Sequence, residues 1–296
     1  MSATDKAIPL NPECCRPEIA EPAIDKPYLT ILPSAGRASL ELKEVWQYRE
    51  LLYFLIWRDI KLRYKQTALG AIWAIIQPLL PMLIFTLFFG RLAHLPSNGI
   101  PYSLFAYAGL LPWTYFSNAV SNSSSSVVAN ANLVTKVYFP RMLIPLSGVL
   151  AALVDFFIAS VILVAMMIWY RVPLCVSQLW VPVILLAITL LAAGTGMLFA
   201  ALNVRFRDIR FALPFLVQFW MFATPVIYPA SLVPAKWRWL LALNPMAGLV
   251  EGFRAALFGT ALEWQMLAIS TLAAALLLIY SVYFFRRAER TFADVI

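Results

Sequence analysis

Long apolar stretches dominate this 296-residue chain, and several of them are long enough to cross a lipid bilayer. A membrane-spanning helix needs about 20 mostly apolar residues. Six stretches meet or approach that length: residues 68–90, 104–128, 142–170, 179–203, 212–228 and 262–285. The fifth is short and contains Pro214 and Pro225, and the second ends in the polar run 121–126. The pattern predicts an all-α, polytopic membrane protein whose residues 68–296 form six transmembrane helices.

Residues 41–67, just before the first span, mix charges with an apolar stripe. The apolar positions recur at three- and four-residue steps, as on one face of a helix. They are Leu42, Val45, Trp46, Leu52, Tyr53, Ile56 and Ile60. Such a helix lies in the membrane interface, with its basic side chains toward anionic lipid. The alternative, which can hold as well, is packing against a cytoplasmic partner.

Residues 229–259 are apolar, but they are too short for two spans and too broken for one. Pro234 and the pair Asn244-Pro245 divide them. We expect a re-entrant helical hairpin on the outer side, between the fifth and sixth spans. Irregular backbone persists at membrane depth only where protein buries it or where it lines a wet cavity. The segment therefore indicates a transport pathway.

Composition supports a membrane protein and sets its orientation. The chain is 62% hydrophobic and 13% charged, against about half and a quarter in soluble domains. The net charge of +8 would suggest nucleic acid in a soluble protein. Here the basic residues gather in short segments on one side of the predicted spans, which marks the cytoplasmic side. Both termini are therefore expected in the cytoplasm, and no nucleic acid partner is expected.

The remaining composition excludes several kinds of chemistry. Residues 1–40 contain six prolines and no apolar core of a signal peptide, which predicts a disordered tail. His94 is the only histidine, and three cysteines are too few for a disulfide framework. Catalysis by histidine is excluded, and neither a catalytic residue nor a metal site is predicted.

Four groups of residues follow one another along the chain: WRDIKLRYKQTALG at 57–70 with Trp73 and Gln77-Pro78, NLVTK at 132–136 with Phe139-Pro140-Arg141, NVRFRD at 203–208, and PVIYP at 225–229 with Asn244-Pro245-Met246. In order and spacing they resemble the permease subunits of type-2 ATP-binding-cassette exporters. The resemblance is closest to the branch that exports polysaccharides, such as lipid-linked O-antigen, capsule and teichoic acid. It covers the chain from about residue 40 to the end.

The resemblance implies a homodimer in the bacterial inner membrane, with a pathway between its subunits and two separate ATPase subunits on the cytoplasmic face. ATP and Mg²⁺ would be bound by the ATPase and no cofactor by this chain, which contains no G-x-x-x-x-G-K-[ST] phosphate loop. By resemblance, residues 130–141 form the coupling helix that docks on the ATPase; a plain cytoplasmic loop is the alternative. Its expected contact residues are Asn132, Leu133, Val134, Thr135, Lys136, Tyr138 and Arg141.

Aromatic residues are dense in the second and fifth predicted spans. Sugars present flat C–H faces that pack on rings, and Tyr and Trp add a polar edge. The rings we expect to line a glycan pathway are Tyr107, Trp113, Tyr115, Trp220 and Tyr228, with Phe215, Phe219 and Phe222 as further candidates. The alternative is a lipid-facing surface or an interfacial aromatic belt.

Charged residues offer two further sites. Arg58, Lys61 and Arg63 are candidates to contact the diphosphate of a lipid-linked glycan, because phosphate needs cationic donors; contact with lipid headgroups is the alternative. Glu251 and Arg254, three residues apart on one helical face, could form part of an outer gate or an ordinary ion pair.

Polar residues inside the predicted spans have two interpretations each. An acid in a membrane is costly, and Asp155 could serve proton coupling. We favour a structural lock in which it pairs with a polar neighbour. The polar run 121–126 could face a hydrated lumen or allow close helix packing, and the sequence favours neither.

Together these observations favour the membrane subunit of an ATP-driven exporter of a lipid-linked polysaccharide. A drug or small-molecule exporter permease of the same superfamily is the main alternative. A membrane-embedded glycan-processing enzyme would need larger outer loops or more surface acids and histidines. A secondary transporter or channel would show more intramembrane charges or an inverted repeat.

Overall fold

The computed structural model describes residues 46–65, 70, 72–97, 99–289 and 292 of the chain. Within these residues every regular element is a helix, which confirms the prediction of an all-α protein. The predicted tail and the first two residues of the predicted apolar stripe, Leu42 and Val45, lie outside the described residues.

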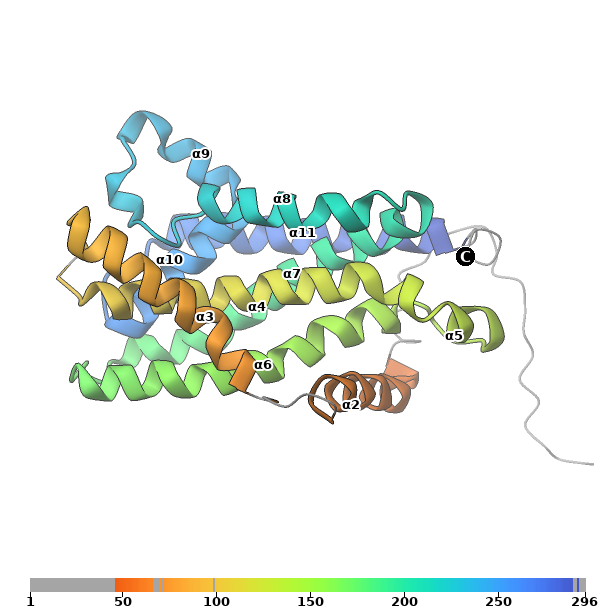
Figure 1. The fold of residues 1–296 in the computed structure, drawn as a ribbon. Coiled ribbons are helices and arrows are strands. Elements are labelled where there is room, and N and C mark those ends of the chain that lie inside the picture. Colours follow the sequence, from red (N-terminus) through yellow and green to blue (C-terminus); the bar gives the residue numbers. More distant parts are fainter. Residues whose placement is uncertain (1–45, 66–69, 71, 98, 290–291, 293–296) are drawn as a thin grey trace, which may run out of the picture. The chain divides into compact units, whose positions relative to one another are not determined.

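The helices follow the chain in the order shown in Figure 1. They are α2 (Arg49–Lys65), α3 (Ile72–Phe85), the π-helix η1 (Thr86–Leu92), α4 (Tyr102–Ala129), α5 (Ala131–Lys136), α6 (Leu143–Trp169), the 3-10 helix η2 (Val176–Trp180), α7 (Val181–Arg205), α8 (Ile209–Ala223), the 3-10 helices η3 (Ala230–Leu232) and η4 (Ala235–Trp237), α9 (Arg238–Leu243), α10 (Pro245–Phe258) and α11 (Trp264–Glu289).

Four helical segments are long and apolar enough to cross a membrane: Ile72–Leu92, Leu143–Trp169, Val176–Arg205 and Trp264–Glu289. They correspond to four of the six predicted spans. Of the other two, α4 has 28 residues, but serines and asparagines make its second half polar. Helix α8 has only 15 residues, because Thr224 is extended before Pro225 and ends it. Membrane crossing by α4 and α8 stays a prediction.

Helix α4 lies at the centre of the packing and contacts α3, α6, α7, α8 and α10. Small residues allow the neighbouring helices to approach it closely. A Cβ atom added to Gly148 of α6 would stand 3.2 Å from the backbone nitrogen of Ser123 in α4. A Cβ atom added to Gly196 of α7 would stand 2.6 Å from the Cβ atom of the same serine. Ser123, Ser124 and Ser126 are buried. The structure thus supports helix packing as the role of these serines.

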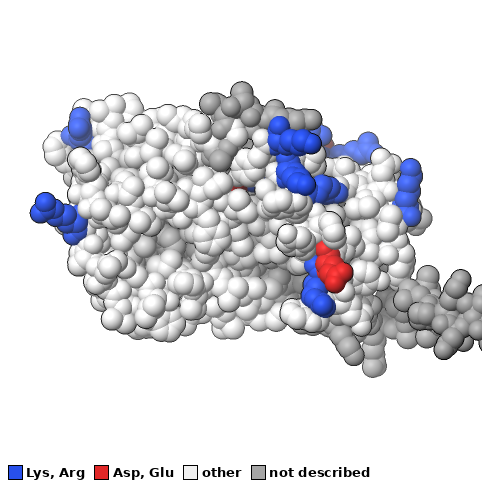
Figure 2. Space-filling view, turned by 90° about the horizontal axis from the view of Figure 1, so that it is seen from below, with Lys and Arg blue, Asp and Glu red and all other residues white. Residues whose placement is uncertain are grey.

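Charged side chains are concentrated toward the two ends of the helices. Figure 1 shows α5 and the C-terminal end of α11 at one end, and α9 at the other. On the face drawn in Figure 2, Lys and Arg gather toward one end, a few lie at the opposite end, and the surface between is almost entirely uncharged. Such a band is what a surface in contact with lipid requires, because a charge in hydrocarbon is costly.

The segment predicted to be re-entrant contains the short helices η3, η4, α9 and α10. Asn244 starts α10: its side chain accepts a hydrogen bond from a backbone N–H of the first turn at 3.1 Å, and Pro245 takes the first helical position. Gly259, with φ +69°, ends the helix. Apart from Glu251, residues 246–257 are buried. The predicted division at Pro245 is confirmed, whereas the depth of the segment in the membrane stays a prediction.

Candidate functional site

Helix α2 packs against α6 through a face that overlaps the predicted stripe only in part. Leu52 of the stripe packs against the core, and Ile56 and Ile60 are half-buried. Trp46 and Tyr53, which also belong to the predicted stripe, are exposed.

Leu55 is the buried residue of α2, and one turn later the carboxylate of Asp59 accepts a hydrogen bond from the hydroxyl of Ser147 in α6 at 2.9 Å. Leu55 and Asp59 lie four residues apart, on the face of α2 that contacts α6. Neither residue belongs to the predicted apolar stripe.

The acid inside the third predicted span, Asp155, is bound by the end of α2. Its carboxylate forms an ion pair with Arg63 and accepts a hydrogen bond from the hydroxyl of Tyr64. Burial raises the pKa of Tyr64, and the hydrogen bond and charge of Asp155 raise it further, so the phenol stays protonated and can donate. Asp155 therefore has the polar partners that a lock between α2 and α6 requires.

The candidate phosphate or headgroup contacts on α2 are Arg58, Lys61 and Arg63. Arg58 pairs with Asp59 at 2.8 Å, and Arg63 pairs with Asp155. The ammonium group of Lys61 lies over the ring of Trp57, 5.3 Å from its centroid. The three cations and the two acids, Asp59 and Asp155, together carry one net positive charge. Its role toward an anion stays a prediction.

Helix α5 and the residues after it lie at the same end as the C-terminal end of α11 (Figure 1). The side chains predicted to contact an ATPase there are Asn132, Leu133, Val134, Thr135, Lys136, Tyr138 and Arg141. Val134 is buried and anchors the short helix. Four of the others are exposed, and Tyr138 is 75% exposed. The segment therefore presents a polar and aromatic surface that a partner could cover, and docking stays a prediction.

Arg141 contacts the chain itself. Its backbone N–H donates to the Glu289 carboxylate at 3.1 Å, and its guanidinium donates to the Glu289 carbonyl oxygen at 2.7 Å. Glu289 is the last residue of α11. The loop after α5 is thereby tied to the end of α11, a contact between residues 148 positions apart that no local sequence pattern reveals.

Three of the predicted pathway rings, Tyr107, Trp113 and Tyr115, are buried inside the packing around α4. The Tyr107 hydroxyl donates to the carbonyl oxygen of Ala159 at 2.9 Å, and the Tyr115 hydroxyl donates to the hydroxyl of Thr189 at 2.9 Å. These bonds join α4 to α6 and α7. A role in lining a pathway stays a prediction, and it would require these helices to separate.

Exposed rings form a stripe on α8, which we call the α8 stripe. Its members, Phe211, Phe215, Phe219 and Phe222, are 70%, 70%, 73% and 55% exposed. Their spacing of three or four residues places them on one helical face. Phe215, Phe219 and Phe222 are among the sequence candidates for the pathway, and their exposure makes them available to a ligand, to lipid or to a second subunit.

The other two predicted pathway rings lie where α8 ends. The indole N–H of Trp220 donates to the side-chain oxygen of Asn244 at 2.8 Å, and the hydroxyl of Tyr228 donates to the carbonyl oxygen of Phe222 at 3.3 Å. Both rings border a mostly apolar pocket of about 720 Å³, together with Phe219. The α8 stripe therefore leads directly into this pocket.

Arg254 of α10 joins three parts of the chain. It is 3% exposed, and its guanidinium donates to the carbonyl oxygens of Pro225, at 2.6 Å, and Val226. The same group lies over the ring of Phe105 in α4, 3.8 Å from its centroid. The predicted ion pair with Glu251 is present at 3.5 Å. The geometry is that of a clamp on the segment after α8, and a gating role stays a prediction.

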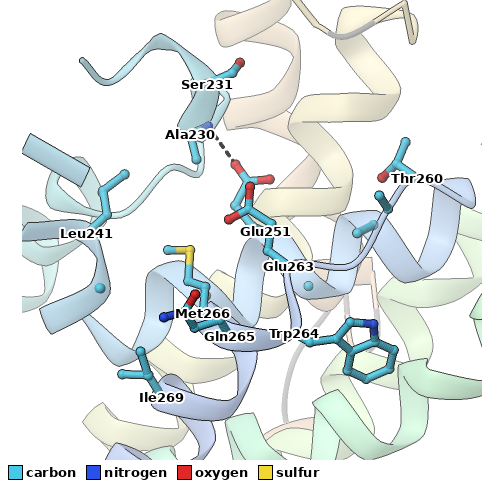
Figure 3. A pocket seen from close by; sticks show the side chains of 15 residues that line it. Ala230, Ser231, Leu241, Glu251, Thr260, Glu263, Trp264, Gln265, Met266 and Ile269 are labelled. Atoms are coloured by element: carbon cyan, nitrogen blue, oxygen red, sulfur yellow. Dashed lines mark hydrogen bonds between the residues drawn. The ribbon is translucent and has the colours of Figure 1, made fainter. Parts of the chain in front are cut away.

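Glu251 also borders a pocket of about 640 Å³ at the same end of the helices. Figure 3 shows the carboxylates of Glu251 and Glu263 close together in this pocket, with Trp264 at its side. The Glu251 carboxylate accepts a hydrogen bond from the backbone N–H of Ala230 at 2.9 Å. Glu251 therefore holds both η3 and Arg254 in place.

Comparison with known sequences decides the family. The sequence profile of the ABC-2 type transporter family matches residues 50–258, from α2 to the end of α10. The chain belongs to this family. Membership in the ABC-2 family confirms the resemblance seen in the sequence motifs, and it agrees with the four apolar helices in identifying a multi-pass membrane protein.

Several relatives match this ABC-2 chain over most of its length. The O-antigen export system permease protein RfbA of Klebsiella pneumoniae is 29% identical over 249 residues, which cover 83% of this chain and 95% of the relative. The protein of the same name from Myxococcus xanthus is 36% identical over 220 residues, or 73% of this chain and 84% of the relative. The polysialic acid transport protein KpsM of Escherichia coli is 26% identical over 207 residues, or 68% and 79%.

Proposed function

We propose that this chain is the membrane subunit of an ATP-driven exporter that moves a lipid-linked polysaccharide across the bacterial inner membrane. It acts as a transport component, and a separate ABC ATPase binds ATP and Mg²⁺ and hydrolyses the nucleotide. One observation carries the proposal: relatives named for the export of O-antigen and the transport of polysialic acid match 68% or more of this chain.

The proposed assembly contains two copies of the chain and two ATPase subunits. Both termini and α5 face the cytoplasm, because the excess of Lys and Arg lies at that end. Helices α3, α4, α6, α7, α8 and α11 are the six spans. Helix α2 lies in the inner interface, and the segment from η3 to α10 lies in the outer leaflet, where α4, α7 and α11 bury α10.

Mechanical input enters at α5. The exposed side chains of Lys136 and Tyr138 contact the ATPase, and closure of the ATPase on ATP displaces α5. The bonds between Arg141 and Glu289 pass this displacement to α11. Because α5 connects α4 directly to α6, both of these helices receive it as well.

The α8 stripe lines the pathway in this proposal. Sugar C–H faces pack on aromatic rings. Because each ring in such a row binds a sugar with modest and similar affinity, a polymer can slide from one ring to the next. Single-stranded nucleic acids stack their bases on aromatic side chains in a similar, sequence-tolerant way. The pocket bordered by Phe219, Trp220 and Tyr228 continues the stripe at its outer end.

Two experiments test these points. In cells whose copy of this chain is deleted, we expect surface polysaccharide to disappear and lipid-linked glycan to accumulate on the cytoplasmic side. The double variant Phe215→Ala, Phe219→Ala should reproduce much of that defect. The matched control is Tyr280→Ala, Tyr283→Ala, which removes two exposed rings from α11 and should export normally.

The outcomes separate the two claims. Normal surface polysaccharide in the deletion strain would overturn the proposed function. Loss of export in the deletion strain, with full export by the α8 double variant, would leave the function intact and overturn the assignment of the α8 stripe to the pathway.

A further inference from the structure

A small polar pocket lies where α2, α3, α4 and α6 meet. Its volume is about 250 Å³, and its lining includes Arg63, Trp73, Gln77, Asn118, Asn122 and Asp155. The α3 residues come from the first two turns of that helix, and the α4 residues from its last four turns. Both stretches belong to the half of the bundle nearer α5, so the pocket lies on the side where a cytoplasmic substrate would enter.

The polar groups of the pocket are positioned by contacts within the chain. The Asn118 side-chain N–H donates to the side-chain oxygen of Gln77 at 2.8 Å, and among the described residues the other ends of both amides have no hydrogen-bond partner. Arg63 and Tyr64 hold the carboxylate of Asp155. Together these pairs form a rim with residues from four different helices.

Asn122 differs from its neighbours. It lines the pocket and is half-buried, yet its side-chain amide forms no hydrogen bond with any residue that the structure describes. A half-buried amide that faces a pocket without a protein partner can bond to water or to a ligand there. The amide offers donors and an acceptor, so a bound molecule with hydroxyl groups would satisfy it.

Charge and size narrow the choice of ligand. The positive charge of Arg63 and the negative charge of Asp155 cancel, so a diphosphate would face a carboxylate with no net positive charge to offset the repulsion. A neutral, hydroxyl-rich group meets no such penalty. Trp73 is 50% exposed and offers a flat surface for C–H groups. The volume falls below the roughly 300–1,000 Å³ of pockets for drug-sized ligands, which fits one sugar ring.

We propose that this pocket binds a single sugar residue of the transported glycan on the cytoplasmic side. The ring packs on Trp73, and its hydroxyl groups bond to Asn122, to the free ends of the Gln77–Asn118 pair and to Asp155. This inference rests on the proposed function and adds a sugar-recognition subsite to it, distinct from the α8 stripe.

The test uses the chain purified together with its ATPase in lipid nanodiscs. ATP hydrolysis is measured against the concentration of lipid-linked glycan isolated from the cells that make the protein, and of the same carrier lipid stripped of its glycan. The variants are Asn122→Ala, which breaks no internal hydrogen bond among the described residues, and Trp73→Ala on a different helix. The control is Ser125→Ala, which removes an exposed hydroxyl three residues further along α4.

We expect each pocket variant to raise the glycan concentration for half-maximal stimulation about three- to tenfold, as loss of one contact to a ligand does. The response to the stripped carrier should not change, and Ser125→Ala should match the wild type. The inference is overturned if both pocket variants match the wild type, or if they shift the responses to glycan and stripped carrier equally. A wild-type complex that no glycan stimulates would instead refute the proposed function, and this subsite with it.

Discussion

Replacement of Arg254 by alanine removes a buried cation that holds α4, α10 and the segment after α8 together. The guanidinium donates to the carbonyl oxygens of Pro225, at 2.6 Å, and Val226, and it lies 3.8 Å from the ring centroid of Phe105. Both carbonyls would lose these donors in the variant. Glu251 would also lose its cationic partner at 3.5 Å.

The expected loss follows from these contacts. A hydrogen bond from a charged donor contributes about 1.5–3 kcal/mol, and the guanidinium of Arg254 makes two such bonds, to the carbonyl oxygens of Pro225 and Val226. The Nε of Arg254 is buried and has no hydrogen-bond partner among the described residues, so alanine also relieves one unfavourable group. We therefore expect the free energy of unfolding to fall by about 3–5 kcal/mol rather than by the larger sum of all contacts.

The measurement is reversible unfolding of the purified protein in mixed detergent micelles, followed by tryptophan fluorescence as the denaturing detergent is increased. Arg254→Lys keeps the charge but loses the planar, forked donor, so its loss should be intermediate. Glu251→Gln should cost less than Arg254→Ala, because the pair is long and both hydrogen bonds from Arg254 to backbone carbonyls remain. A loss below about 1 kcal/mol for Arg254→Ala would refute the clamp.

Three further predictions concern other contacts. Gly109→Ala would place a Cβ 2.8 Å from the carbonyl oxygen of Val226 and from Cζ of Arg254, so it should destabilise the protein by about 1–3 kcal/mol in the same titration; wild-type stability would contradict this packing. Asp155→Asn removes the charge that binds the end of α2, so amide hydrogen exchange should accelerate in α2 and not in α7; equal exchange in wild type and variant would argue against the lock. Lys136→Glu on the exposed side of α5 should weaken capture of the ATPase about tenfold, with unchanged amounts of the chain in the membrane; undiminished capture would exclude docking through this residue.

The helices themselves could be predicted from sequence because long apolar runs have few other solutions. The runs that became α3 with η1, α6, η2 with α7, and α11 are each bounded by polar or charged residues, and each is long enough to cross a bilayer. The breaks also followed local rules, because Pro225 and Pro245 fix the backbone wherever they stand. Such features depend on neighbouring residues only.

Which aromatic rings are exposed could not be predicted, because that depends on which helices pack together. Tyr107 and Tyr115 of α4 and the phenylalanines of α8 are all aromatic residues within largely apolar helical stretches. Yet α4 lies between five other helices and α8 does not. A partial signal existed: α4 is apolar or small on all sides through residues 104–116, which is typical of a helix buried all round.

The polar contacts escaped prediction for a related reason. Asp155 could be recognised as an acid that needs a partner, but its partners lie on α2, about 90 positions away in the sequence. Arg141 looked like part of the coupling surface because its motif places it there, and the structure bonds it to Glu289. Long-range pairs of this kind follow from the packing of helices and not from local spacing.

Reconstitution tests the central claim most directly. The chain and its ATPase are inserted into liposomes whose outer leaflet carries lipid-linked glycan, ATP is added outside, and the glycan that remains accessible to an added glycosidase is measured over time. ATP should make the glycan inaccessible only when both proteins are present, and an ATPase variant unable to hydrolyse ATP should abolish the effect. Protection of the glycan by this chain alone, without any ATPase, would contradict the account.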